Sequence, residues 1–125
     1  MFKQIIFLFI YLILVVSCSK DKSKVNTDLL QEDVETEMIL AYKEGMRQLE
    51  LGDVLFASKK FDEAEIMFPQ SIWAAKASLM SAYALYSQNY YEDALFNLNR
   101  HIKNYPKDKN LVYAHYLVAM CYFEQ

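Results

Sequence analysis

The sequence predicts an all-α fold in which helical hairpins stack into a solenoid. Three observations predict it. The 125 residues include only 2 Gly and 2 Pro, too few for a turn-rich β-sandwich. Apolar side chains recur at helical spacing from about residue 36 onward. The chain also matches itself when shifted by 37 residues, the distance from Pro69 to Pro106, and such self-similarity is typical of repeat proteins.

Composition and charge exclude several classes of protein. Hydrophobic residues make up 54% of the chain, too many for a chain that is disordered throughout. The formal net charge is -3, whereas nucleic-acid binders normally carry a basic face. Two cysteines do not make a disulfide framework. We therefore expect one domain, or part of one, with no nucleic-acid partner.

Residues 1–17 are predicted to form a lipoprotein signal peptide. Lys3 supplies a positive charge, and residues 5–16 form an unbroken apolar run. As a helix this run spans ~18 Å, short of a ~30 Å hydrocarbon core, so a secretory segment fits better than a membrane span. The run ends in Val-Val-Ser-Cys, which resembles a bacterial lipobox and implies cleavage after Ser17 and lipidation of Cys18. An ordinary signal peptide with a nearby cysteine is the alternative.

Acyl chains on Cys18 would anchor the protein to a membrane. By the resemblance to bacterial lipoproteins, Ser19 after the cysteine favours the outer membrane. Residues 18–35 are predicted to form a flexible tether, because no apolar period begins before Leu29. The lysines of the tether either rest on anionic lipid or are simply solvated. Its acidic residues alternatively begin the first helix, where carboxylates suit the positive end of the helix dipole.

Residues 36–125 are predicted to form the repeat domain. Its turns fall at Gly52 and Asn89, residue types that accept a left-handed backbone. Pro69 and Pro106 are expected to end the second helix of each pair. The expected helices are 36–51, 54–67, 72–88, 91–104 and 110–124.

Small residues recur at equivalent places in the repeats. Small residues are expected where paired helices approach closely, because a larger side chain there would overpack the core at a cost of roughly 1–3 kcal/mol. They are Gly45, Ala57, Ala82, Ala94 and Ala119. Ser71 is expected to cap the third helix, and Asp108 or Asn110 the fifth.

The spacing Gly52-x-Val54-x-x-Ala57-x-x-x-Phe61-x-x-Ala64 resembles the tetratricopeptide repeat. A looser second copy runs from Asn89 to His101, and the period exceeds the usual 34 residues by three. The resemblance implies stacked helix pairs, with the first helix of each pair lining a concave side.

A lipobox followed by such repeats resembles the BamD family of outer-membrane assembly lipoproteins, above all its α-proteobacterial members. The resemblance covers about residues 37–125. It implies a non-enzymatic scaffold, lipid-anchored in the outer membrane and facing the periplasm, that helps to recognise and insert β-barrel proteins. The stretches that carry it are Tyr42-Lys43-Glu44-Gly45, 68–74, 79–86, Tyr91-Glu92-Asp93-Ala94, 113–117 and 121–125.

The family also implies partners: the barrel subunit and other lipoproteins of the β-barrel assembly complex, and unfolded outer-membrane protein clients. The family has about five repeats, so we expect a sequence truncated in the third repeat. The last helix would then leave an apolar face uncovered, formed by Tyr116, Leu117, Met120 and Phe123. Two other functions stay open. One is an envelope or peptidoglycan adaptor, and the other is an enzyme, such as a protease with its catalytic part beyond Gln125.

One apolar stripe along the first helices is a candidate client-binding groove. Its members recur at the same offset in three helices, and most are aromatic or Met, side chains that give large and adaptable contact area. The family implies that these repeats recognise the aromatic-rich C-terminal signal of clients. Such a stripe also fits plain packing between helices. Its members are Tyr42, Met46, Leu49, Leu79, Tyr83, Tyr86, Tyr116, Met120 and Phe123.

No sequence pattern indicates catalysis or a bound cofactor. The two histidines are not at metal-ligand spacing, and neither a phosphate-binding glycine loop nor a nucleophile elbow is present. His101 and Cys121 are expected in the core, and Trp73 is expected to wedge between repeats. We therefore expect no enzyme activity, metal, cofactor or small-molecule substrate.

Overall fold

The computed structural model describes residues 24–125, with side chains from residue 32 onward, and this part of the chain is all-α. The prediction of the fold class is therefore confirmed. The expected signal peptide (1–17) and Cys18 lie outside the described residues. The helices are α2 (Lys24–Glu50), α3 (Val54–Met67), α4 (Ile72–Ser87), α5 (Tyr91–Asn104) and α6 (Leu111–Glu124).

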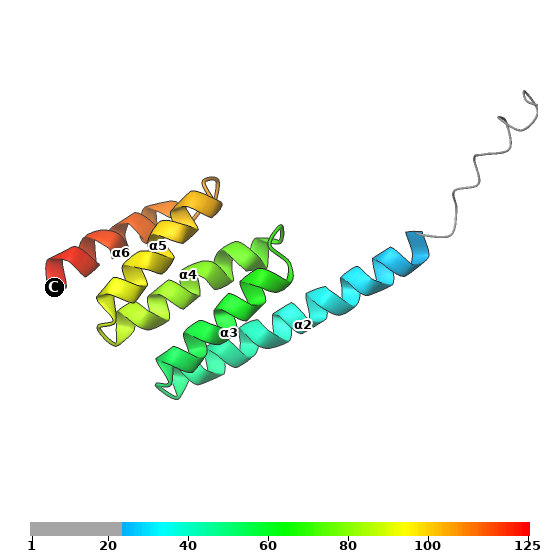
Figure 1. Cartoon of the computed structure of the whole chain (residues 1–125), viewed down its shortest axis with the longest axis horizontal. Helices are drawn as coiled ribbons and strands as arrows, with labels where there is room; N and C mark the ends of the chain where they lie inside the picture. Colours follow the sequence, from blue (N-terminus) through cyan, green and yellow to red (C-terminus); the bar gives the residue numbers. More distant parts are fainter. Residues whose placement is uncertain (1–23) are drawn as a thin grey trace, which may run out of the picture. The chain divides into compact units, whose positions relative to one another are not determined.

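By its internal contacts the chain divides into two compact units, residues 1–31 and 32–125, and the packing described below concerns the second. Within it, α3, α4 and α5 each pack against the next helix along the chain, as consecutive hairpins (Figure 1). α4 also contacts α6, so first helices of successive pairs are neighbours. This arrangement is the stack of helix pairs that the tetratricopeptide-like spacing predicts.

The first helix begins earlier than expected, at Lys24 rather than near residue 36. No Gly or Pro interrupts the chain between Lys24 and Gly45, and its Leu, Gln and Glu residues favour helix. The segment expected to be a flexible tether is thus helical from Lys24 onward. The acidic residues lie inside α2 and not in its first turn, so attraction to the helix dipole does not explain the early start.

The turns follow the residue types that predict them. Gly52 and Asn89 have left-handed backbone, with φ of +83° and +65°. Each lies in the short connection that reverses the chain between the two helices of a pair. Pro69 and Pro106 follow closely after the ends of α3 and α5, as predicted.

Side chains cap two of the helix starts. At the start of α4, Ser71 Oγ accepts a hydrogen bond of 3.0 Å from the Ala74 N–H, as predicted. At the start of α3, Asp53 Oδ1 accepts one of 3.1 Å from the Phe56 N–H. Asn110 occupies the cap position of α6, but its side chain makes no capping bond.

Two buried clusters form the core, one for each repeat. Phe61 is fully buried in the first cluster, and Leu98, 37 residues later, is fully buried in the second. Ala57 and Ala94 are likewise fully buried. Ala119, the third member of the Gly45 series, is exposed, so its expected place at a tight helix seam is wrong within the described residues.

A buried hydrogen-bonded chain joins three consecutive helices. Asn97 Nδ2 of α5 donates to Ser81 Oγ of α4, at 2.8 Å, and Ser81 Oγ lies 2.8 Å from Ser58 Oγ of α3. Because buried polar groups are costly without partners, this chain favours one register of the helices.

A second polar cluster joins the two repeats through α3 and α5. Arg100 donates to Asp62 at 2.7 Å and to Glu65 at 2.8 Å, and the Tyr105 hydroxyl donates to Glu65 at 3.1 Å. Glu65 is buried, so its charge depends on these partners. None of the helices within residues 24–125 is both long and apolar enough to span a membrane.

Candidate functional site

The nine residues of the predicted apolar stripe do not form one exposed groove. Tyr42 and Leu79 are buried. Tyr116 and Phe123 are strongly exposed, at 55% and 84%. The remaining five are half-buried: Met46, Leu49, Tyr83, Tyr86 and Met120.

Tyr42 belongs to the core of the first repeat. Its ring packs edge-on against Phe61 and Trp73, with centroid distances of 5.3 and 5.4 Å. Burial raises the pKa of its hydroxyl above the ordinary value. Trp73 thus links α4 to α2 and α3 through Tyr42, which fits the predicted wedge. Met46 and Leu49 pack against the same cluster.

Tyr83 and Tyr86 lie at the C-terminal half of α4, against the second core cluster. The Tyr86 hydroxyl donates to Glu124 Oε1 of α6 at 3.3 Å, and the Tyr91 hydroxyl donates to Glu124 Oε2 at 2.7 Å. The hydrogen bond to Glu124 raises the pKa of Tyr91 to about 12. The centroids of the Tyr86 and Tyr91 rings lie 5.9 Å apart. This surface therefore combines aromatic rings with hydroxyl groups at its edge.

The outer face of α6 differs in part from the prediction. Leu117 is only 1% exposed and packs in the second cluster, so its expected place on an uncovered face is wrong. Helical periodicity turns it toward the core between α4 and α5, whereas Tyr113 and Tyr116 stack on the exposed side with centroids 6.1 Å apart. The large apolar residues of α6 that are exposed are Val112, Tyr113, Tyr116, Tyr122 and Phe123.

His101 and Cys121 are buried, as predicted. His101 Nε2 lies 3.2 Å from Asp108 Oδ2. Burial lowers the pKa of His101, and the neighbouring Asp108 carboxylate opposes this shift in part. Burial raises the pKa of the Cys121 thiol. No group of three or more His, Cys, Asp or Glu side chains among residues 32–125 is placed to hold a metal ion.

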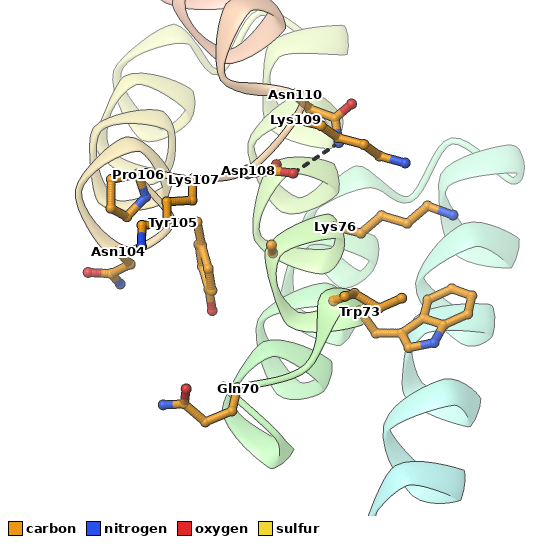
Figure 2. A pocket seen from close by; sticks show the side chains of 12 residues that line it. Gln70, Trp73, Lys76, Asn104, Tyr105, Pro106, Lys107, Asp108, Lys109 and Asn110 are labelled. Carbon is orange, nitrogen blue, oxygen red and sulfur yellow. Dashed lines mark hydrogen bonds between the residues drawn. The ribbon is translucent and has the colours of Figure 1, made fainter.

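A groove of about 970 Å³ lies elsewhere, and the sequence analysis missed it. One wall is the start of α4 with the residues before it, and the other is the connection from α5 to α6 (Figure 2). In the sequence, only the Lys-Asp-Lys segment at residues 107–109 indicates a charged surface at this place.

Residues 34–125 match the model of the family YfiO, described as an outer membrane lipoprotein. A Caulobacter vibrioides protein named outer membrane protein assembly factor BamD is 40% identical over 86 residues, which are 69% of this chain and 28% of that protein. The protein of the same name from Rickettsia prowazekii is 30% identical over 91 residues, which are 73% of this chain and 36% of that protein. The chain thus spans about a third of the length of these relatives. No solved structure matches it significantly.

Proposed function

Because this chain belongs to the YfiO family of outer membrane lipoproteins, the family of the BamD proteins, we propose that it takes part in assembling β-barrel proteins in the outer membrane. It acts there as a non-enzymatic scaffold, within a complex of a barrel subunit and other lipoproteins. The main support is the family match over residues 34–125, which coincides with the packed unit 32–125. The name assembly factor, carried by both relatives, supports the role.

The proposal includes an anchor at the N-terminus. Residues 1–17 are removed as a signal peptide, and Cys18 is lipidated and holds the protein on the outer membrane, facing the periplasm. The lipobox sequence supports this step. Mass spectrometry of the mature N-terminus tests it, because it should find an acylated cysteine, and Cys18→Ala should abolish labelling by palmitate. An intact N-terminus, or labelling that survives Cys18→Ala, would refute the anchor.

We propose that the client-binding surface is formed by Tyr83, Tyr86 and Met120. These half-buried side chains come from α4 and α6, two helices that contact each other. Aromatic and Met side chains suit an extended, apolar client segment, and the Tyr86 hydroxyl offers a polar group at its edge. Tyr42 and Leu79 are buried and are therefore not part of this surface. Leu79 belongs to the second core cluster, against which Tyr83 and Tyr86 pack.

Two measurements test the proposed function. Purification of the tagged chain from cells should recover the barrel subunit, and recovery of cell-wall enzymes without that subunit would point to the adaptor function instead. Tyr83→Ala with Tyr86→Ala should weaken binding of client C-terminal peptides about tenfold or more. The control is Tyr122→Ala, an exposed residue of α6 outside this surface, which should leave binding unchanged.

A further inference from the structure

The groove between the start of α4 and the α5–α6 connection carries unpaired positive charge (Figure 2). Its lining includes Lys76, Lys107 and Lys109, and none of them forms a salt bridge with a described residue. Lys76 Nζ lies 5.0 Å from the centroid of the Trp73 ring and 5.1 Å from that of Tyr42, so these rings hold its ammonium group, and the positive charge nearest the α5–α6 connection comes from Lys107 and Lys109. The chain as a whole is acidic, so this positive charge is a local feature.

The one carboxylate among the residues that line the groove is turned inward. The Asp108 side chain is 10% exposed, and its Oδ2 lies 3.2 Å from Nε2 of the buried His101. Its Oδ1 accepts a hydrogen bond of 3.4 Å from Asn110 Nδ2, drawn as a dashed line in Figure 2. Asp108 is therefore largely buried against His101 and Asn110 and forms no salt bridge with Lys76, Lys107 or Lys109.

Apolar groups stand beside these charges. Trp73 and Tyr105 contribute aromatic surface, Pro106 adds a rigid ring, and Ile72 is 86% exposed. Such a lining suits a ligand that offers carboxylates together with an apolar side chain. Small anions alone would leave this apolar surface in water.

We propose that this groove binds an acidic, extended segment of a partner protein, in which carboxylates flank an aromatic or proline residue. The groove's volume accommodates several residues of a peptide, and Lys107 and Lys109 supply positive charge on the wall formed by the α5–α6 connection. A flat anionic membrane would instead favour lysines on a convex surface, so the peptide is the better fit. The positive charge accelerates and orients the association, and the apolar wall selects among acidic segments.

This site is separate from the proposed client-binding surface. Trp73 and Lys76 stand in the first turns of α4, whereas Tyr86 stands in its last turn. From residue 73 to residue 86 the helix rises ~20 Å. Failure of one binding site can therefore be told from failure of the other.

Trp73 provides the readout, because it is the only Trp of the chain and lines the groove. The probe is a Trp-free peptide in which Asp and Glu flank Phe-Pro, titrated against the whole chain at low salt. We expect a saturable change in Trp73 fluorescence that weakens as salt is added. The same peptide with Asn and Gln in place of its acidic residues should bind about tenfold more weakly. Equal binding of the two peptides would overturn the proposal.

Matched lysine variants localise the effect. Lys107→Gln with Lys109→Gln should weaken the acidic peptide about tenfold, whereas Tyr86→Ala should leave its affinity unchanged. The control pair is Lys43→Gln with Lys59→Gln, since both lysines are exposed and outside the groove. Equal loss in the two lysine pairs would mean unspecific attraction and refute the site. The site would also be refuted if Lys107→Gln with Lys109→Gln weakened sedimentation with phosphatidylglycerol vesicles but left peptide binding unchanged. That result would indicate a membrane contact instead.

Discussion

Gly45 of α2 lies so close to the ring of Phe61 in α3 that a Cβ built on it would be 2.8 Å from Phe61 Cε1. In the next repeat the equivalent residues are Ala82 and Leu98, which share the second core cluster. The first repeat thus pairs the smallest residue with a large ring, and the second pairs a methyl group with a smaller side chain. In both repeats the seam between the paired helices thus accommodates one small and one large side chain, whose summed volume is limited by close packing.

This complementarity predicts the effect of adding a methyl group at residue 45. Gly45→Ala gains about 1 kcal/mol in helix propensity but overpacks the core at a cost of roughly 1–3 kcal/mol, so we expect a net loss in the free energy of unfolding. Combined with Phe61→Leu, which reproduces the second repeat, the change should be less harmful than additivity predicts, by about 1 kcal/mol. Urea unfolding of the two single variants and the double variant measures this coupling.

The control for that experiment is Gly52→Ala. Gly52 has no atom within 4 Å of a built Cβ, but its φ of +83° strains any other residue. It should therefore lower stability through the backbone alone, and its effect should add to that of Phe61→Leu. The packing argument would be contradicted if Gly45→Ala were as stable as the parent chain. It would also be contradicted if Gly45→Ala and Gly52→Ala showed the same coupling energy with Phe61→Leu.

Two buried serines of α4 should respond in different ways to removal of their hydroxyl groups. Ser81→Ala removes the acceptor of Asn97 and the partner of Ser58, so we expect a loss of about 1–3 kcal/mol in the free energy of unfolding. The Ser78 hydroxyl is equally buried and has no hydrogen-bond partner among the described residues. Ser78→Ala should therefore be neutral or stabilising. Urea denaturation compares them, and equal losses would show that the hydrogen-bonded chain is not what matters.

The contacts of Arg100 predict that its replacement lowers the stability of the protein more than replacement of Arg47. Arg100→Met leaves the buried Glu65 carboxylate without its cation and should cost about 1–3 kcal/mol of stability. Arg47 pairs with Glu44 within α2 on the surface, and such exposed pairs contribute little to stability. Arg47→Met is thus the control. Thermal unfolding of both variants checks the prediction, which fails if the two losses are the same.

His101 predicts a dependence of stability on pH. Burial lowers its pKa below the ordinary value of 6.5, so the unfolded chain takes up a proton more readily than the folded one. The free energy of unfolding should therefore fall as the pH drops below about 6.5, through the region of the folded pKa. Neighbouring Asp108 opposes the shift of the pKa, and Arg100 adds to it.

His101→Gln, which does not titrate, should remove this part of the pH dependence. Urea unfolding at about pH 7.5 and pH 5.5 gives the difference in stability for each variant. His115→Gln, at an exposed position of α6, should keep the parent difference. A parent-like pH dependence in His101→Gln would show that other groups cause it.

The sequence predicts the repeat architecture well because local signals and long-range packing agree. Gly52 and Asn89 mark the turns, and the offset of 37 residues between Phe61 and Leu98 marks equivalent core positions. The start of α2 is predicted poorly, because a polar segment without Gly or Pro carries neither an apolar period nor a stop signal. Helix boundaries of this kind depend on propensity alone.

The candidate site is predicted less well than the fold, since an apolar stripe does not reveal which of its members a neighbouring helix covers. Tyr42 and Tyr116 occupy equivalent sequence positions, but α3 and Trp73 cover Tyr42 while Tyr116 is exposed. The lysine-lined groove arises from two connections that are distant in sequence. Its two walls, at Trp73 and at residues 104–110, come together only when α4 packs against α5.

We propose that this repeat domain holds unfolded outer-membrane proteins at the surface around Tyr86. The most direct test places a photo-reactive amino acid at residue 86 in cells and identifies what it captures. We expect cross-links to the C-terminal segments of unfolded outer-membrane proteins, with few or none from the same group at residue 122. Capture of no such protein at residue 86, or equal capture at both positions, would contradict it.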